Sequence, residues 1–163
     1  MGLADLRAFF YDTWAFVALA NTADPWHALS VHADRKLEEK GLAAVTSDYV
    51  LDETITLLHV TAGFPVAERF LDNVQTRIEG KDLLLADVSA SRREQALAVF
   101  RRLGRGSPGL SFTDCTSFVL MRELGIRTAF TGDADFHRAG GGIRPLLLRR
   151  GRTLRLELPE DLS

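Results

Sequence analysis

Four acidic residues, separated by tens of positions, are the feature of this sequence with the clearest chemical meaning. Asp12 ends one run of apolar residues and Asp133 closely follows another. Both are therefore expected at the C-terminal ends of strands, where open parallel sheets bind ligands. Glu53 and Asp114 lie within helical patterns, on the sides that apolar residues occupy. Brought together, four carboxylates suggest a divalent-metal site that can hydrolyse phosphodiesters.

The helical position of Glu53 differs from that of its acidic neighbour. On an ideal helix at about 100° per residue, Glu53 falls between Leu57 and Val60, whereas Asp52 points to the opposite side. We therefore expect Glu53 to face inward and Asp52 to face water. An ionised carboxylate on an apolar face is costly unless it is paired or bound to a cation.

Asp114 shows the same conflict, since it shares a helix face with Phe118. A structural alternative stays open, because Ser111 and Asp114 have the spacing of a capping box. Asp12 and Asp133 also have an alternative, as aspartate is common in the turns that follow strands. The joint pattern favours a site, because all four acids are expected at the crevice where α/β sheets bind ligands.

The chemistry of these ligands predicts which ion they would hold. Hard carboxylate oxygens select Mg²⁺ or Mn²⁺, and Mg²⁺ usually takes only one or two protein carboxylates and keeps several waters. Four acids could hold one or two such ions, which would activate a water for attack on phosphorus. The hydroxyls of Thr13, Ser111 and Thr131 are candidates for orienting the waters or the carboxylates.

Strand-like and helix-like segments alternate along the chain, which favours a parallel sheet with helices on both faces. We expect an α/β fold of three layers, with a central, mostly parallel sheet of four or five strands. Strands are expected at about residues 8–12, 42–46, 83–88 and 128–131, and either 145–148 or 153–158 could supply a fifth. Helices are expected before residue 21 and at about 25–40, 48–62, 65–79, 91–103 and 111–124.

Length and composition are those of one globular domain. The chain has 163 residues, 46% of them hydrophobic, which suffices for a substantial core. Residues 1–163 are therefore expected to form one domain, with 140–163 as a loop plus a C-terminal edge segment. The single cysteine, Cys115, is interpreted as a buried small side chain. Neither a signal peptide nor a membrane span is evident, so a cytoplasmic protein is expected.

Charge is distributed unevenly along the sequence. Residues 1–91 are acidic, whereas residues 92–155 contain 13 arginines and only five acids. Guanidinium groups suit phosphate oxygens, so these arginines form a pool of possible contacts to an RNA or DNA backbone. A solvated arginine-rich surface is the alternative for any single member.

Three segments resemble the PIN domain family, and among its groups the bacterial VapC-type toxins. They are the segment 10–19 around Asp12, the segment 110–126 around Asp114, and Thr-Gly-Asp-Ala-Asp-Phe at 131–136. The resemblance implies a PIN-like α/β/α fold and an endoribonuclease that depends on Mg²⁺ or Mn²⁺. It also implies that Asp12, Glu53, Asp114 and Asp133 are the catalytic and metal-site acids. A homodimer and a small antitoxin protein are the implied partners, and RNA is the implied substrate.

Some features depart from this pattern and leave alternatives. Trp14 occupies a position where related proteins commonly carry a small or polar residue, and Asp135 offers another acid that could share the role of Asp133. A phosphatase with an aspartyl nucleophile is a poor alternative, because Trp14 stands where its second aspartate would be expected. An RNA-processing nuclease outside a toxin system, or an RNA-binding or assembly module without turnover, remains as the alternative function.

Overall fold

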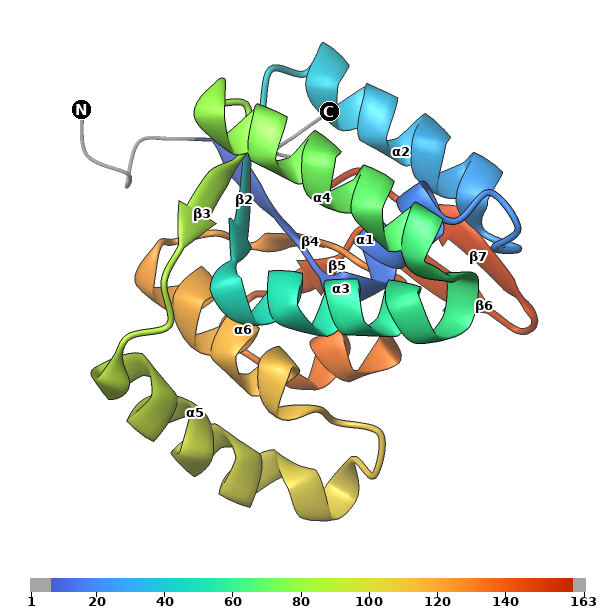
Figure 1. Ribbon diagram of the computed structural model, residues 1–163. Coiled ribbons are helices and arrows are strands. Elements are labelled where there is room, and N and C mark those ends of the chain that lie inside the picture. Colours follow the sequence, from blue (N-terminus) through green and yellow to red (C-terminus); the bar gives the residue numbers. More distant parts are fainter. Residues whose placement is uncertain (1–6, 160–163) are drawn as a thin grey trace.

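The computed structural model describes residues 7–159, which form a parallel sheet, its covering helices and a C-terminal hairpin (Figure 1). The strands are β1 (Ala8–Tyr11), β2 (Ala43–Ser47), β3 (Leu84–Ala86), β4 (Thr128–Phe130), β5 (Arg144–Pro145), β6 (Leu147–Arg150) and β7 (Thr153–Leu156). The α-helices are α1 (Thr13–Ala20), α2 (His27–Glu39), α3 (Asp48–Ala62), α4 (Phe64–Glu79), α5 (Ala90–Leu103) and α6 (Phe112–Glu123). Two short 3-10 helices are η2 (Gly104–Gly106) and η3 (Ala134–Arg138).

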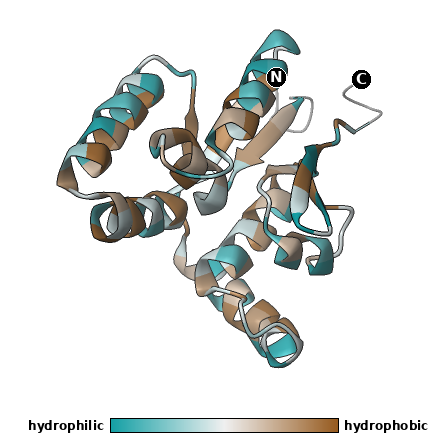
Figure 2. Ribbon diagram, turned by 90° about the vertical axis from the view of Figure 1, so that its right-hand side faces the viewer, coloured by the Kyte–Doolittle hydropathy of each residue, from teal (hydrophilic) through white to brown (hydrophobic). Residues whose placement is uncertain are grey.

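Five strands form the central sheet in the order β3-β2-β1-β4-β5, and every neighbouring pair is parallel. Figure 1 shows the strands passing between α2 and α4 on one side and α6 on the other, with α5 outside α6. The predicted three-layer α/β/α fold is therefore confirmed. Parallel strands covered on both faces are expected to be apolar throughout, and the central strands are mostly hydrophobic in Figure 2.

The end of β1 shows how the sheet directs side chains to its two faces. The Tyr11 ring stacks on Phe16 of α1, with 4.6 Å between ring centroids, and Arg77 of α4 lies 5.1 Å from its centre. Asp12 keeps an extended backbone, and its N–H donates to the carbonyl of Phe130 at 3.3 Å. Since side chains alternate along extended chain, Asp12 leaves the sheet on the face opposite Tyr11, toward α6.

Local signals place the helix ends, with two small errors. Ser47 caps α3, because its hydroxyl accepts a hydrogen bond from the Val50 N–H. The cap of α5 is Ser89, so this helix begins at Ala90, one residue before the expected start. α2 begins at His27, so Pro25 belongs to the preceding turn and not to the first helical turn.

The C-terminal region differs from the prediction. Only Arg144–Pro145 joins the central sheet, as the edge strand β5. β6 and β7 pair with each other in a separate two-stranded antiparallel sheet, so the segment at 153–158 does not form the edge of the central sheet. A short parallel edge strand followed by a hairpin leaves no long unpaired strand at this side, which is how natural sheets limit edge pairing.

Burial agrees with several further expectations. Cys115 is fully buried. Phe70 and Val74 of α4 are also core residues, so the side of α4 that carries them faces the interior. No helix in residues 7–159 is both long and apolar enough to span a bilayer.

Candidate active site

A pocket of about 230 Å³ lies at the carboxyl ends of the central strands and contains all four predicted acids. Asp12 follows β1, Glu53 lies in α3, Asp114 lies in the first turn of α6, and Asp133 follows β4. Their convergence follows from topology, because β1 and β4 are adjacent parallel strands that end at the same edge of the sheet. The lining is completed by Thr13, Trp14, Val17, Asp24, Leu57, Gly109 and Ser111.

Asp12 is the most deeply buried of these acids, at 2% exposure. Its Oδ2 accepts a hydrogen bond of 2.7 Å from the Thr131 hydroxyl, which in turn accepts from the Asp133 N–H at 3.0 Å. Its Oδ1 is also buried and has no hydrogen-bond partner within the described chain. A buried carboxylate oxygen without a donor is costly, so this atom marks a position where a cation would be favourable.

Asp114 takes part in the predicted capping box and lines the pocket as well. The Ser111 hydroxyl accepts from the Asp114 N–H at 3.0 Å, and Asp114 Oδ2 accepts from the Ser111 N–H at 2.8 Å. The capping alternative is therefore correct, but it does not exclude a role in the site. Because the box uses Oδ2, it fixes the carboxylate and does not occupy Oδ1.

The two remaining acids are held less tightly. Glu53 is half-buried, and its Oε2 accepts a long hydrogen bond of 3.5 Å from the Thr13 hydroxyl. Asp133 caps η3, since its Oδ1 accepts from the Asp135 N–H at 2.9 Å. Asp133 contributes to the pocket lining and Asp135 does not, which favours Asp133 as the fourth acid.

The predicted surroundings of Glu53 were partly wrong. Asp52 is exposed, as expected, but Leu57 and Val60 are 40% and 78% exposed. The apolar side of α3 beside Glu53 is therefore open surface at the pocket and not core. The buried side of the helix is formed by Val50, Thr54 and Leu58.

Asp24 is an acid of the pocket that the sequence did not suggest. It lies in the turn between α1 and α2, where its Oδ1 accepts from the Trp26 N–H at 2.8 Å. Its sequence context indicates a turn, and only the path of the chain back over the pocket brings it to the acids. Five carboxylates thus line the pocket, and no Lys, Arg or His of the described chain is part of the lining.

Burial and mutual repulsion make the two central carboxyl groups hard to ionise. Burial raises the pKa of Asp12 to about 8, and the nearby charges of Asp114 and Asp133 add to the rise. Burial likewise raises the pKa of Asp114 to about 7, together with the charges of Asp133 and Glu53. The hydroxyl of Thr131 and the backbone of Ser111 oppose these shifts only in part. The pocket thus favours binding of positive charge, either protons or a metal ion.

The donor set fits a hard divalent cation held largely through water. Among residues 7–159, no three His, Cys, Asp or Glu side chains are arranged closely enough to form a ready chelate. Mg²⁺ does not require one, since it commonly binds one or two carboxylates and keeps its waters. Asp12, with its unpartnered Oδ1, and Asp114 are the best placed direct ligands. Their role, and that of Glu53 and Asp133, stays a prediction.

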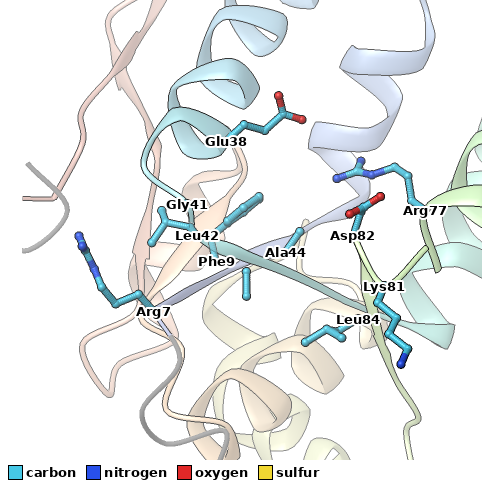
Figure 3. A pocket seen from close by; sticks show the side chains of 11 residues that line it. Arg7, Phe9, Glu38, Gly41, Leu42, Ala44, Arg77, Lys81, Asp82 and Leu84 are labelled. Carbon is cyan, nitrogen blue, oxygen red and sulfur yellow. The ribbon is translucent and has the colours of Figure 1, made fainter. Parts of the chain in front are cut away.

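A larger cavity, of about 1020 Å³, lies at the opposite end of the sheet (Figure 3). Its lining contains side chains of both signs, among them Glu38, Arg77, Lys81 and Asp82. Figure 3 shows Glu38, Arg77 and Asp82 extending into the same opening. The acidic pocket is therefore not the most spacious cavity of the described chain, and its distinguishing feature is its charge.

Comparison with known proteins agrees with this fold. The PIN domain family model matches residues 9–142. The chain is 34% identical over 134 residues to the 23S rRNA-specific endonuclease VapC20 of two Mycobacterium tuberculosis strains, covering 80% of this chain and 93% of that protein. The crystal structure of M. tuberculosis VapC20, described as a Sarcin-Ricin loop cleaving toxin, matches with a TM-score of 0.69 and 32% identity, over 85% of this chain and 100% of that one. This chain belongs to the PIN domain family.

Proposed function

We propose that this chain is an endoribonuclease that uses Mg²⁺ or Mn²⁺ to hydrolyse phosphodiester bonds of RNA. The observation that carries the proposal is the buried, unpartnered Oδ1 of Asp12 in a pocket lined by five carboxylates. Similarity to a 23S rRNA-specific endonuclease over 93% of that protein supports the same reading.

The residues of the pocket have distinct roles in this mechanism. Asp12 and Asp114 would hold the ion, and Glu53 and Asp133 would serve as further ligands or orient its waters. When bound, the ion supplies a nucleophilic water at neutral pH and neutralises charge on the phosphate. Thr131 keeps Asp12 in place through its 2.7 Å hydrogen bond.

The walls of the pocket strengthen these charge interactions. Trp14, Val17 and Leu57 border the acids with apolar surface. Apolar walls reduce the local dielectric, so that the attraction between carboxylates and a cation is screened less than in open water. The capping box of α6 fixes Asp114 before the ion binds, which lowers the cost of ordering the site.

The proposed substrate is the sarcin–ricin loop of 23S ribosomal RNA, by analogy with the VapC20 relatives. The test is incubation of purified protein with ribosomal RNA in Mg²⁺, Mn²⁺ or EDTA, followed by sequencing of the new RNA ends. We expect metal-dependent cuts at one position and none in EDTA. RNA binding without cleavage would favour the module that lacks turnover.

We further propose that the chain is the toxin of a type II pair with a small antitoxin protein. Three apolar side chains, Leu57, Val60 and Phe64, are 40%, 78% and 58% exposed, and Leu57 also lines the pocket. Exposed apolar surface of this kind is typical of protein contacts. Induction should arrest growth, and co-expression of the antitoxin should relieve the arrest. Normal growth on induction of active enzyme would favour an RNA-processing nuclease outside a toxin system.

The proposed oligomeric state is a homodimer. Leu97 and Phe100 on the outer helix α5 are 46% and 42% exposed, which adds a second apolar surface available for association. Light scattering of the purified chain measures its mass directly. A monomeric mass at micromolar concentration would contradict the dimer and leave the nuclease proposal intact.

A further inference from the structure

The β6–β7 hairpin, residues 147–156, is hydrogen-bonded to the wall of the acidic pocket. As the chain leaves β5, the Leu146 N–H donates to the Ala129 carbonyl at 2.7 Å and the Leu147 N–H donates to the Thr131 carbonyl at 3.2 Å. Thr131 is the residue whose hydroxyl holds Asp12. The hairpin therefore begins at the residue that positions the most buried acid of the site.

Side-chain packing seats the hairpin against the same wall. A Cβ atom built on Gly132 would lie 2.9 Å from Cδ1 of Leu154 in β7, and 2.6 Å from the indole of Trp14. These distances are shorter than carbon atoms tolerate, so only glycine fits between the hairpin and α1. Gly132 directly precedes Asp133, and the hairpin thus borders the pocket.

The pairing of β6 with β7 determines from which side of the hairpin each arginine extends. Arg149 pairs with Leu154, and opposed residues in antiparallel strands share one side. Arg149 therefore extends from the side that packs over Gly132. Arg155 pairs with Leu148, in the alternate set, and extends from the other side. Arg152 lies at the tip, next to Gly151 with its φ of +63°.

Most of these guanidinium groups are available for a ligand. Arg150 forms an exposed ion pair of 3.4 Å with Glu157. Arg149, Arg152 and Arg155 are exposed, and none of them forms a side-chain hydrogen bond or an ion pair with the described part of the chain.

The other arginines of residues 92–155 form contacts within the fold or lie away from the hairpin. Arg92 binds both oxygens of Glu123, at 2.9 and 2.6 Å, and Arg138 donates to Ser107. Arg144 pairs with Thr128, at the start of parallel strands and thus at the end of the sheet away from the pocket. Arginines also lie on the outer helix α5 and on the following η2, among them Arg101, Arg102 and Arg105.

We propose that the side and tip of the hairpin next to the pocket bind the RNA backbone, with Arg149 and Arg152 contacting phosphates that flank the bond to be cut. The inference rests on the proposed function. A pocket lined by five carboxylates repels a polyanion, so an adjacent cationic surface is needed to hold the strand there. Arg149 and Arg152 are positioning residues rather than catalytic ones.

Binding is tested without cleavage, in an Asp12→Asn background, by fluorescence anisotropy of a labelled stem-loop that copies the sarcin–ricin loop. We expect Arg149→Gln/Arg152→Gln to raise Kd about tenfold or more and to lower the slope of log Kd against log salt by about 0.7–0.9 per arginine. Arg155→Gln is the matched control for Arg149→Gln, since it removes the same charge from the opposite side of the same hairpin. A smaller effect of Arg155→Gln is expected.

Steady-state cleavage in the Asp12 enzyme supplies the second measurement. The double variant should show a higher KM with kcat little changed, because the ion-binding acids are intact. Equal effects of Arg149→Gln and Arg155→Gln, or an unchanged Kd in the double variant with normal melting temperature, would overturn the inference. If the enzyme with Asp12 cuts no RNA and the side-selective loss of binding persists, the nuclease proposal fails and the hairpin surface stands.

Discussion

At the amino ends of the central strands, the cavity of about 1020 Å³ is lined by charged side chains of both signs, whereas every charged side chain that lines the pocket of about 230 Å³ at the carboxyl ends is acidic. In the larger cavity Lys81 and Asp82 are exposed to water, and Arg77 donates a hydrogen bond of 3.2 Å to Tyr11. In the smaller pocket Asp12 is buried with one oxygen unpartnered. Uncompensated buried charge, rather than volume, therefore identifies the candidate site.

The two regions also differ in how charge is satisfied near the sheet. On the face opposite Asp12, the Tyr11 hydroxyl donates to Asp34 and accepts from Arg77, so that a buried phenol has partners of both kinds. Burial and the charge of Asp34 raise the pKa of Tyr11 far above its usual range, which keeps the group neutral. A network of this kind stabilises the fold. No Lys, Arg or His of residues 7–159 lines the acidic pocket, and the repulsion among its acids would be relieved by a bound ion.

The largest expected effect is the loss of cleavage in Asp12→Asn. We expect the rate to fall by about a thousandfold, on the order of 4 kcal/mol, because a neutral amide holds a divalent ion poorly. The measurement is single-turnover cleavage of the stem-loop in Mn²⁺. The matched control is Asp82→Asn, the same change at the other cavity, where the rate should stay within about twofold of the parent. Undiminished cleavage by Asp12→Asn would refute the active-site assignment.

The second prediction concerns the pH dependence of stability without metal. The folded pKa of Asp12, about 8, lies above the ordinary value of 3.8 for this side chain. The folded state therefore binds protons more tightly than the unfolded state. This contribution is fully present below about pH 4 and is lost as pH rises through about 8. In EDTA, the free energy of unfolding should fall by several kcal/mol across this window, and Asp114 acts in the same direction.

Urea titrations at a series of pH values measure this change. Asp12→Asn should flatten the profile and exceed the parent in stability near pH 8, whereas Asp82→Asn should keep the parent slope. Metal-free stability that increases between pH 5 and pH 8 would show that the pocket carboxyls are not held in their protonated form.

The third prediction is stabilisation by metal. An ion that binds only the folded chain stabilises it by about 2.7 kcal/mol at one hundred times its Kd. For a domain of this size, that corresponds to a rise of about 5–10 °C in Tm. Differential scanning fluorimetry in Mn²⁺ provides the measurement, with Asp12→Asn/Asp114→Asn as the variant expected to lose the response. An equal rise in that variant would place the ion elsewhere.

The sequence was sufficient for the layers of the fold and for the convergence of the four acids. In a parallel sheet the carboxyl ends of adjacent strands lie at the same edge, so the sequence alone predicts that Asp12 and Asp133 lie close together. Helix signals were equally local, as with the hydroxyl of Ser47. The expected start of α5 is one residue late, because the helix is capped by Ser89, whose hydroxyl accepts from the Arg92 N–H.

Other features depend on contacts that no local pattern encodes. Helical periodicity places Glu53 beside the apolar residues Leu57 and Val60. It does not show that these two residues face solvent, because an exposed apolar stripe and a buried one have the same spacing. Asp24 enters the pocket only because its turn folds over it. The pairing of β6 with β7 likewise depends on which strand edges are free after β5 has joined the sheet.

The smallest effect, and the sharpest comparison, comes from two buried threonines on the central sheet and at its carboxyl edge. Thr131 donates to the carboxylate of Asp12 at 2.7 Å, and Thr46 of β2 donates to the backbone carbonyl of Tyr11 at 3.1 Å. Replacing either by Val removes one buried hydroxyl with little change in shape, and each should cost about 1 kcal/mol of stability.

Of these two changes, only the one at Thr131 should alter metal binding, because the Thr131 hydroxyl contacts a carboxylate of the pocket and the Thr46 hydroxyl contacts a backbone carbonyl. We expect Thr131→Val to weaken Mn²⁺ binding by about tenfold and Thr46→Val to leave it unchanged, both measured by calorimetry. Equal Mn²⁺ affinities in two variants of equal stability would mean that Asp12 is positioned by the backbone alone. A selective loss in Thr131→Val would instead tie the metal affinity of the carboxyl end to a single hydroxyl, which donates to Asp12 and accepts from the Asp133 N–H.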